Sequence, residues 1–136
     1  MSIGVVIVTN NHLGEEFLKA LQQIVPDPPE FESVAIEPGQ SIEDMRKGID
    51  RALTRADQGQ GVLVLTDMFG GTPSNISLSF LDDRRVEVVT GLNLPMLIKL
   101  ATLREEKELE DLAVFVKDYG RRNISVAREI LPEEET

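Results

Sequence analysis

The 136-residue sequence has no cysteine, no tryptophan, one histidine and one tyrosine. Without cysteine, the chain can form neither disulfide bonds nor thiolate metal sites. A single histidine is too few for a convincing zinc site, so we expect no metal and no other cofactor. Aromatic residues are scarce, with five phenylalanines beside the one tyrosine, so the core must be built mainly from Val, Ile, Leu and Ala.

Basic residues are also under-represented, with 14 Lys and Arg against 24 Asp and Glu, for a formal net charge of −10. A charge of this sign repels nucleic acids and anionic membranes over the molecule as a whole. The short basic stretch Arg121-Arg122 does not overturn this expectation, although it could dock an acidic partner. An acidic domain can equally attract a basic partner and speed its encounter.

Long hydrophobic runs are missing as well. The apolar run 3–8 is too short to span a bilayer, and the start of the chain lacks the basic region of a signal peptide. Motifs of several enzyme classes are also absent, among them Gly-x-Ser-x-Gly, His-Glu-x-x-His and Gly-x-Gly-x-x-Gly. We therefore expect a cytoplasmic protein without direct insertion into the membrane.

Short β-branched segments alternate with amphipathic segments along the chain. Segments 3–8, 33–37, 62–65 and 86–89 are typical of strands, the first and third being apolar throughout, as in strands buried on both faces. Between and after them, apolar residues at helical spacing predict helices, for example at Leu13, Phe17, Leu21 and Ile24. The length and order predict one α/β domain, residues 1–136, with an open, doubly wound, mainly parallel sheet and helices on both faces.

Several local signals predict where helices begin and end. Ser41 is a good N-cap for the second helix. Thr72 suits the cap and Pro73 the first position of the third helix. A further helix is expected over 109–119, ended by Gly120. Segment 123–131 is ambiguous, because its apolar residues fit a strand and a helix about equally.

Three polar loops follow the ends of predicted strands, at 9–12, 66–75 and 90–95. In open parallel sheets, ligands bind beyond the carboxyl ends of the strands. In the middle loop, Gly70 and Gly71 allow the backbone to approach a ligand closely, and Thr72 adds a hydroxyl at a helix N-terminus. This pattern predicts an anion site, although a simple turn that requires glycine remains an alternative. No lysine follows the glycines, so the loop is not a P-loop.

Two further side chains are candidates for chemistry at this edge. Asp67 follows a buried strand, where a carboxylate can orient an imidazole and stabilise its cation. Alternatively, it caps the turn that follows. His12 is the only histidine, and a neutral imidazole nitrogen can attack phosphorus. A surface histidine near the first turn of a helix is the simpler interpretation.

The sequence resembles the IIA domains of mannose-class sugar phosphotransferase systems over essentially its whole length. The resemblance is most specific at "GVLVLTDMFGGTPSN" (residues 61–75), and it extends to "IGVVIVTNNHLGEEFL" and "VEVVTGLNLPMLIKLA". It implies a phosphocarrier that accepts a phosphoryl group on histidine from the histidine-containing phosphocarrier protein and passes it to a IIB component. It also implies a homodimer, in which an antiparallel C-terminal strand is exchanged; residues 123–131 would suit that strand.

The resemblance assigns roles to single residues. Asp67 matches the aspartate that supports the active histidine, and Gly70, Gly71 and Thr72 match the loop that cradles the phosphate. The family's phosphohistidine directly follows the Thr at the end of the first strand, but here Thr9 is followed by Asn10. An amide nitrogen is not nucleophilic, because its lone pair is delocalised. Asn10 can still satisfy Asp67 by hydrogen bonding.

Three interpretations of this departure stay open. In the first, Asn10 blocks phosphorylation of a IIA component. In the second, His12 has become the acceptor, although the loop would have to move by several ångströms, judging from ~3.3 Å per extended residue. In the third, the chain is a non-catalytic regulatory binding module of a system without a sugar permease. The phosphocarrier subunit of a dihydroxyacetone kinase is a more distant alternative, which the Phe-Gly-Gly-Thr-Pro loop disfavours.

Overall fold

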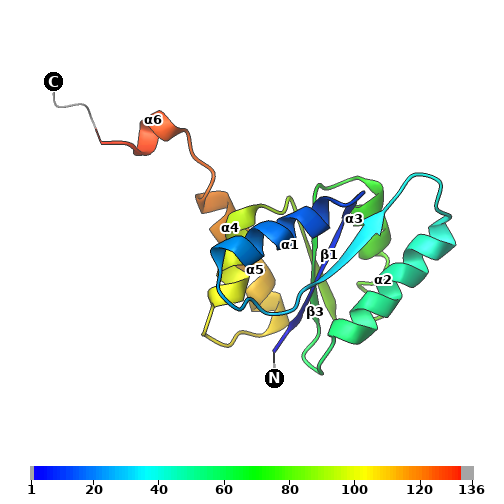
Figure 1. The fold of residues 1–136 in the computed structure, drawn as a ribbon. Coiled ribbons are helices and arrows are strands. Elements are labelled where there is room, and N and C mark those ends of the chain that lie inside the picture. Colours follow the sequence, from blue (N-terminus) through cyan, green and yellow to red (C-terminus); the bar gives the residue numbers. More distant parts are fainter. Residues whose placement is uncertain (1, 133–136) are drawn as a thin grey trace.

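The computed structural model describes residues 2–132, which form a central sheet covered by helices (Figure 1). The strands are β1 (Gly4–Asn10), β2 (Glu32–Ile36), β3 (Val62–Thr66) and β4 (Val86–Thr90). They lie in the order β2-β1-β3-β4, and every neighbouring pair is parallel. The chain therefore reverses direction across the sheet after β2, and the predicted doubly wound parallel sheet is confirmed.

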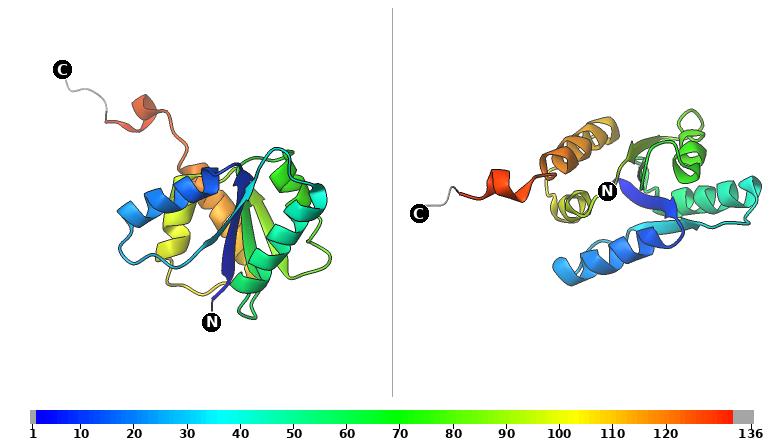
Figure 2. Two further views of the ribbon diagram at one scale, coloured as in Figure 1. Left: turned by 45° about the vertical axis from the view of Figure 1, so that its right-hand side comes forward. Right: turned by 90° about the horizontal axis from the view of Figure 1, so that it is seen from above.

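Helices cover both faces of this sheet, as the view from above in Figure 2 shows. Residues alternate between the faces along each strand. Val5 and Ile7 of β1 therefore belong to one apolar core and Val6 and Val8 to the other. The helices are α1 (Leu13–Ile24), α2 (Ile42–Ala56), α3 (Thr72–Leu78), α4 (Leu94–Thr102), α5 (Leu109–Arg122) and α6 (Ala127–Ile130). The first core includes side chains of α1, α4 and α5, and the second includes those of α2 and α3.

The helix starts follow from local hydrogen bonding. Ser41 caps α2 as predicted, because its Oγ accepts a hydrogen bond from the Asp44 N–H at 3.0 Å. The third helix differs by one residue from the prediction. Gly71 occupies the cap of α3, Thr72 is its first residue and Pro73 its second. Pro73 is still accommodated there, since the N–H groups of a first helical turn have no acceptor within the helix.

Gly120 does not end α5, contrary to the prediction, and the helix continues to Arg122. The absence of a side chain allows close packing instead, because a Cβ at this position would force the side chain of Met96 in α4 to move. The carbonyl of Gly120 also accepts a hydrogen bond from Asn93 Nδ2 at 3.0 Å. Asn93 itself caps α4, so one side chain joins the start of α4 to the end of α5.

Residues 123–131 extend away from the rest of the chain in both figures, with α6 as their only regular element (Figures 1 and 2). The antiparallel strand predicted for this segment is not present in the single chain, because the segment lies beside no strand with which it could form hydrogen bonds. Exchange of such a strand in a dimer stays a prediction. Within residues 2–132, no helix combines the length and apolar character needed to cross a membrane.

Candidate functional site

Asn10 and Asp67 meet at the end of the sheet where the strands have their carboxyl ends. Asn10 is the last residue of β1, and Asp67 directly follows β3, which lies beside β1 in the sheet. The side-chain Nδ2 of Asn10 donates a hydrogen bond to Asp67 Oδ2 at 2.9 Å, and the backbone N–H of Asn10 donates to the same oxygen at 3.0 Å. The structure thus brings together two residues that the sequence predicts for one site.

The third hydrogen bond to this carboxylate comes from its own loop. Asp67 Oδ1 accepts the backbone N–H of Met68 at 3.1 Å. Both carboxylate oxygens are therefore engaged, and the group is fixed in orientation while the residue remains partly exposed. A carboxylate held in this way can accept a hydrogen bond from an amide N–H or from an imidazole N–H.

A buried threonine fixes the loop that presents Asn10. Thr9 is fully buried, and its Oγ1 accepts a hydrogen bond from the Gly14 N–H at 2.8 Å and donates one to the Asn11 carbonyl at 3.3 Å. Asn11 adopts a left-handed backbone with a φ of 50°, which asparagine tolerates better than most residues. Its N–H donates to the carbonyl of Ile36 at 2.8 Å. These bonds tie the loop to both α1 and β2.

His12 lies at the N-cap of α1 and contacts two glutamates instead of Asp67. Its Nδ1 is 3.2 Å from Glu15 Oε2, and its Nε2 is 2.7 Å from Glu37 Oε1. The hydrogen bond and the charge of Glu15, together with the smaller effects of Glu37, raise the pKa of His12 above its usual value of 6.5. A protonated ring has no free lone pair, so this arrangement disfavours His12 as a nucleophile on phosphorus.

The loop after Asp67 leads directly into α3. Gly70 has a φ of 88°, a left-handed conformation that favours glycine, and Gly71 is extended at the cap of the helix. The Asn75 N–H closes the first turn by donating to the Gly71 carbonyl at 2.9 Å. Phe69 is 72% exposed and Met68 54% exposed, so this loop presents apolar side chains to solvent next to the Asn10–Asp67 pair.

Thr9, Asn11, Thr66 and Ser74 lie in the predicted site loops, but the sequence assigned them no role, and it did not connect Glu37 with the site. Thr9, Asn11 and Glu37 shape it through the bonds described above. The hydroxyls of Thr66 and Ser74 are buried beside the loop and have no hydrogen-bond partner within residues 2–132. The only available signal was the presence of polar residues immediately next to strand ends. Among the same residues, no group of three or more His, Asp or Glu side chains could hold a metal ion.

Comparison with known proteins gives a consistent family assignment. Residues 4–117 match the EIIA-man family, described as PTS system fructose IIA component. The chain is 34% identical to the PTS system fructose-specific EIIA component of Bacillus subtilis (strain 168) over 99 residues, which cover 72% of this chain and 68% of that protein. It is 27% identical to the PTS system mannose-specific EIIAB component of Escherichia coli (strain K12) over 130 residues, or 94% of this chain and 40% of that protein.

Solved structures agree with this assignment. The mannose/sorbose specific IIA subunit of the phosphotransferase system from Enterococcus faecalis superimposes with a TM-score of 0.87 over 100% of both chains, at 26% identity. The phosphotransferase system component EIIA from Streptococcus agalactiae gives a TM-score of 0.83 at 27% identity, covering 93% of this chain and 98% of that one. The fold, the site loops and the matched residues 4–117 lead to one conclusion: the chain belongs to the mannose-class family of phosphotransferase system IIA components.

Proposed function

We propose that this chain is a cytoplasmic IIA component that still docks its phosphotransferase partners but cannot form a phosphohistidine at the usual position. The partners are the histidine-containing phosphocarrier protein on the donor side and a IIB component on the acceptor side. Family membership supports both partners. The block rests on one residue, Asn10, which occupies the place where the resemblance puts the acceptor histidine.

The observation that supports this proposal best is the hydrogen bond from Asn10 Nδ2 to Asp67 Oδ2, at 2.9 Å. The amide reproduces the donor side of an imidazole, so Asp67 keeps a partner and the loops keep their positions. It does not reproduce the nucleophilic side, because the nitrogen lone pair is delocalised into the carbonyl. In this proposal the hydrogen bond between residues 10 and 67 is kept, while phosphorylation of residue 10 is prevented.

His12 does not replace the missing acceptor in this arrangement. Both of its ring nitrogens contact carboxylates, those of Glu15 and Glu37, and its pKa is raised, which favours the protonated ring. Phosphoryl transfer to His12 would require loss of a proton and of at least one of these contacts. The transferred group would also be anionic beside the remaining carboxylate, which costs further energy.

The test is intact mass after incubation with phosphoenolpyruvate, enzyme I and the phosphocarrier protein. Four chains are compared: the chain with the sequence given, Asn10→His, His12→Ala and the double variant Asn10→His/His12→Ala. We expect one phosphoryl group on both chains that contain Asn10→His and none on the other two. A gain in the unsubstituted chain that His12→Ala abolishes would instead identify His12 as the acceptor.

Two further results would test the assignment of the acceptor position to Asn10 and the retention of partner docking. If Asn10→His gains no phosphoryl group although enzyme I and the phosphocarrier protein phosphorylate a control IIA, the assigned site is wrong. If the unsubstituted chain binds the phosphorylated phosphocarrier protein in a pull-down without accepting its phosphoryl group, docking is retained. That second outcome also supports the alternative function, a regulatory binding module, which the same residue Asn10 favours.

A homodimer is the final element of the proposal. β4 forms one edge of the sheet, and the segment after α5 exposes apolar side chains that a partner subunit could cover. Ile124 is 73% exposed and Val126 is 61% exposed. Sedimentation equilibrium tests this element, since a chain that remains monomeric at working concentration has no exchanged strand. The exposed apolar residues of the segment are Ile124, Val126, Ile130 and Leu131.

A further inference from the structure

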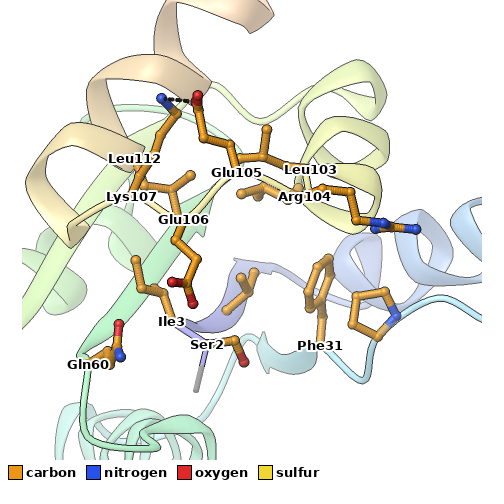
Figure 3. Close-up of a pocket in the computed structure, with 13 residues that line it drawn as sticks. Ser2, Ile3, Phe31, Gln60, Leu103, Arg104, Glu105, Glu106, Lys107 and Leu112 are labelled. Carbon is orange, nitrogen blue, oxygen red and sulfur yellow. Dashed lines mark ion pairs between the residues drawn. The ribbon is translucent and has the colours of Figure 1, made fainter.

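A concave site lies at the end of the sheet where the strands begin, opposite the Asn10–Asp67 site. It is a half-open cavity of about 310 Å³ between the start of β1, the segment leading into β2 and the connection from α4 to α5 (Figure 3). No residue of the Asn10–Asp67 site lines it. This volume lies at the lower end of the range found for small-molecule sites in proteins.

The floor and walls of this cavity are apolar. Val5 and Leu112 are buried residues of the first core, and Ile3, Phe31, Leu100 and Leu103 pack against that core while remaining partly exposed. The cavity is therefore a place where core side chains stay in contact with water. Covering such a surface with an apolar group is favourable, because it removes apolar area from water.

The charges at the rim are not equivalent. Lys107 is neutralised by Glu105, whose Oε1 lies 2.7 Å from the Lys107 Nζ, and Lys107 also stacks over the ring of Phe115. Arg104 is different, because within residues 2–132 its guanidinium has no carboxylate within 4.0 Å; its one hydrogen bond, of 3.2 Å, goes to the Thr102 carbonyl. The exposed Arg104 guanidinium therefore leaves donors beside the cavity that can pair with an anion.

Glu106 sets the direction in which a charged ligand would lie. Figure 3 shows its carboxylate turned toward Ile3 and Ser2, while the Arg104 side chain extends to the other side of the cavity, above Phe31. An anionic group would be repelled at the Glu106 side and attracted at the Arg104 side. An apolar body between them would lie over the floor of the cavity.

We propose that this cavity binds a small monocarboxylate with an apolar or aromatic body. The carboxylate would pair with Arg104, and the body would cover Ile3, Val5 and Phe31. A volume of about 310 Å³ suits a small organic molecule. A second negative charge on the ligand would meet Glu105 and Glu106, which favours one carboxylate over two.

The test is a titration of ¹⁵N-labelled protein with 3-phenylpropionate, followed by amide chemical shifts. We expect saturable shifts at Ile3, Phe31 and residues 103–107, with a dissociation constant on the order of 1 mM or tighter. Two compounds of similar shape are controls: 3-phenylpropionamide, which is neutral, and phenylalanine, which is zwitterionic. Both should bind at least about tenfold more weakly, because the amide lacks the negative charge and the ammonium group of phenylalanine, next to its carboxylate, would be repelled by Arg104.

Arg104→Gln is the decisive variant. It should weaken binding of 3-phenylpropionate about tenfold and leave binding of the amide unchanged, since a charge-assisted pair is replaced by a neutral contact. Arg121→Gln, an exposed arginine at the far end of α5, is the matched control and should change neither. Because Arg104 is exposed, the variant should fold normally, which its own spectrum checks.

Several results would overturn this inference. They are absence of binding, equal binding of the acid and its amide, tighter binding of phenylalanine, or an unchanged affinity in Arg104→Gln. Shifts confined to residues 67–72 would place the anion at the other end of the sheet and would equally contradict it. None of these results depends on whether the chain is phosphorylated, so the inference can fail while the proposed function stands.

Discussion

Two loops build the candidate site, and they differ in how firmly the rest of the chain fixes them. The loop between β1 and α1 is held by several polar contacts. They involve the Thr9 hydroxyl, the Asn11 N–H and the two carboxylates that contact His12. The loop between β3 and α3 is joined to its neighbour mainly through Asp67, and it exposes Met68 and Phe69.

This difference separates positioning from recognition. The first loop places one residue, Asn10, with little freedom, so that its side chain and its backbone N–H both reach Asp67. The second loop offers apolar area that solvent covers in the single chain, as a docking surface requires. A substitution in the first loop should therefore act on folding stability, and one in the second loop on partner binding.

The largest expected effect is that of Thr9→Val. The substitution keeps the volume and removes the buried acceptor of the Gly14 N–H, so the free energy of unfolding should fall by ~1–3 kcal/mol. Urea denaturation measures this change. Thr9→Ser, which retains the hydroxyl, is the control and should lose less. Equal losses in the two variants would mean that the hydrogen bond does not fix the loop.

Phe69→Ser should show the opposite behaviour. Because Phe69 is 72% exposed, the free energy of unfolding should change by no more than ~0.5 kcal/mol. Affinity for the phosphocarrier protein should fall by about tenfold or more, as is usual for a central aromatic contact. Calorimetric titration measures the affinity, and Ile42→Ser, at a 63% exposed residue of α2, is the control. Equal affinities of the two variants would place the docking surface elsewhere.

The smallest expected effect concerns His12 and pH. Its pKa is raised in the folded chain, chiefly by Glu15, so its contribution to stability is fully present below the usual pKa of 6.5 and is lost as the pH rises through the raised value. The thermal midpoint of the unsubstituted chain should therefore exceed that of His12→Gln more at about pH 5.5 than at about pH 8.5. A difference independent of pH would mean that protonation of His12 does not link the loop to Glu15 and Glu37.

The sequence alone predicts most of the fold, because buried parallel strands are unusually distinct in sequence. The run 3–8 and the run 62–65 correspond to β1 and β3, and the edge of the sheet that bears the site follows from their order. Prediction fails where tertiary contacts override a local signal. Gly120 is a typical helix terminator in sequence, yet it lies inside α5, where the side chain of Met96 occupies the space that a Cβ would need.

The site shows the same division. That Asn10 and Asp67 would be neighbours could be predicted, since both follow strands that end at one edge of the sheet. The partners of His12 could be predicted only in part. Glu15 lies three residues away on the same helix, whereas Glu37 is adjacent only because β2 pairs with β1. The cavity beside Arg104 had no signal in the sequence, because it depends on how three distant segments enclose a space.

The bond from Asn93 to Gly120 has a consequence for everything that follows α5. It holds the end of α5 against the start of α4, so the segment that follows begins at a fixed point. Residues 124–131 reach at most about 29 Å from that point when fully extended. A neighbouring surface within this distance meets their apolar side chains at a high effective concentration, and a more distant surface does not meet them.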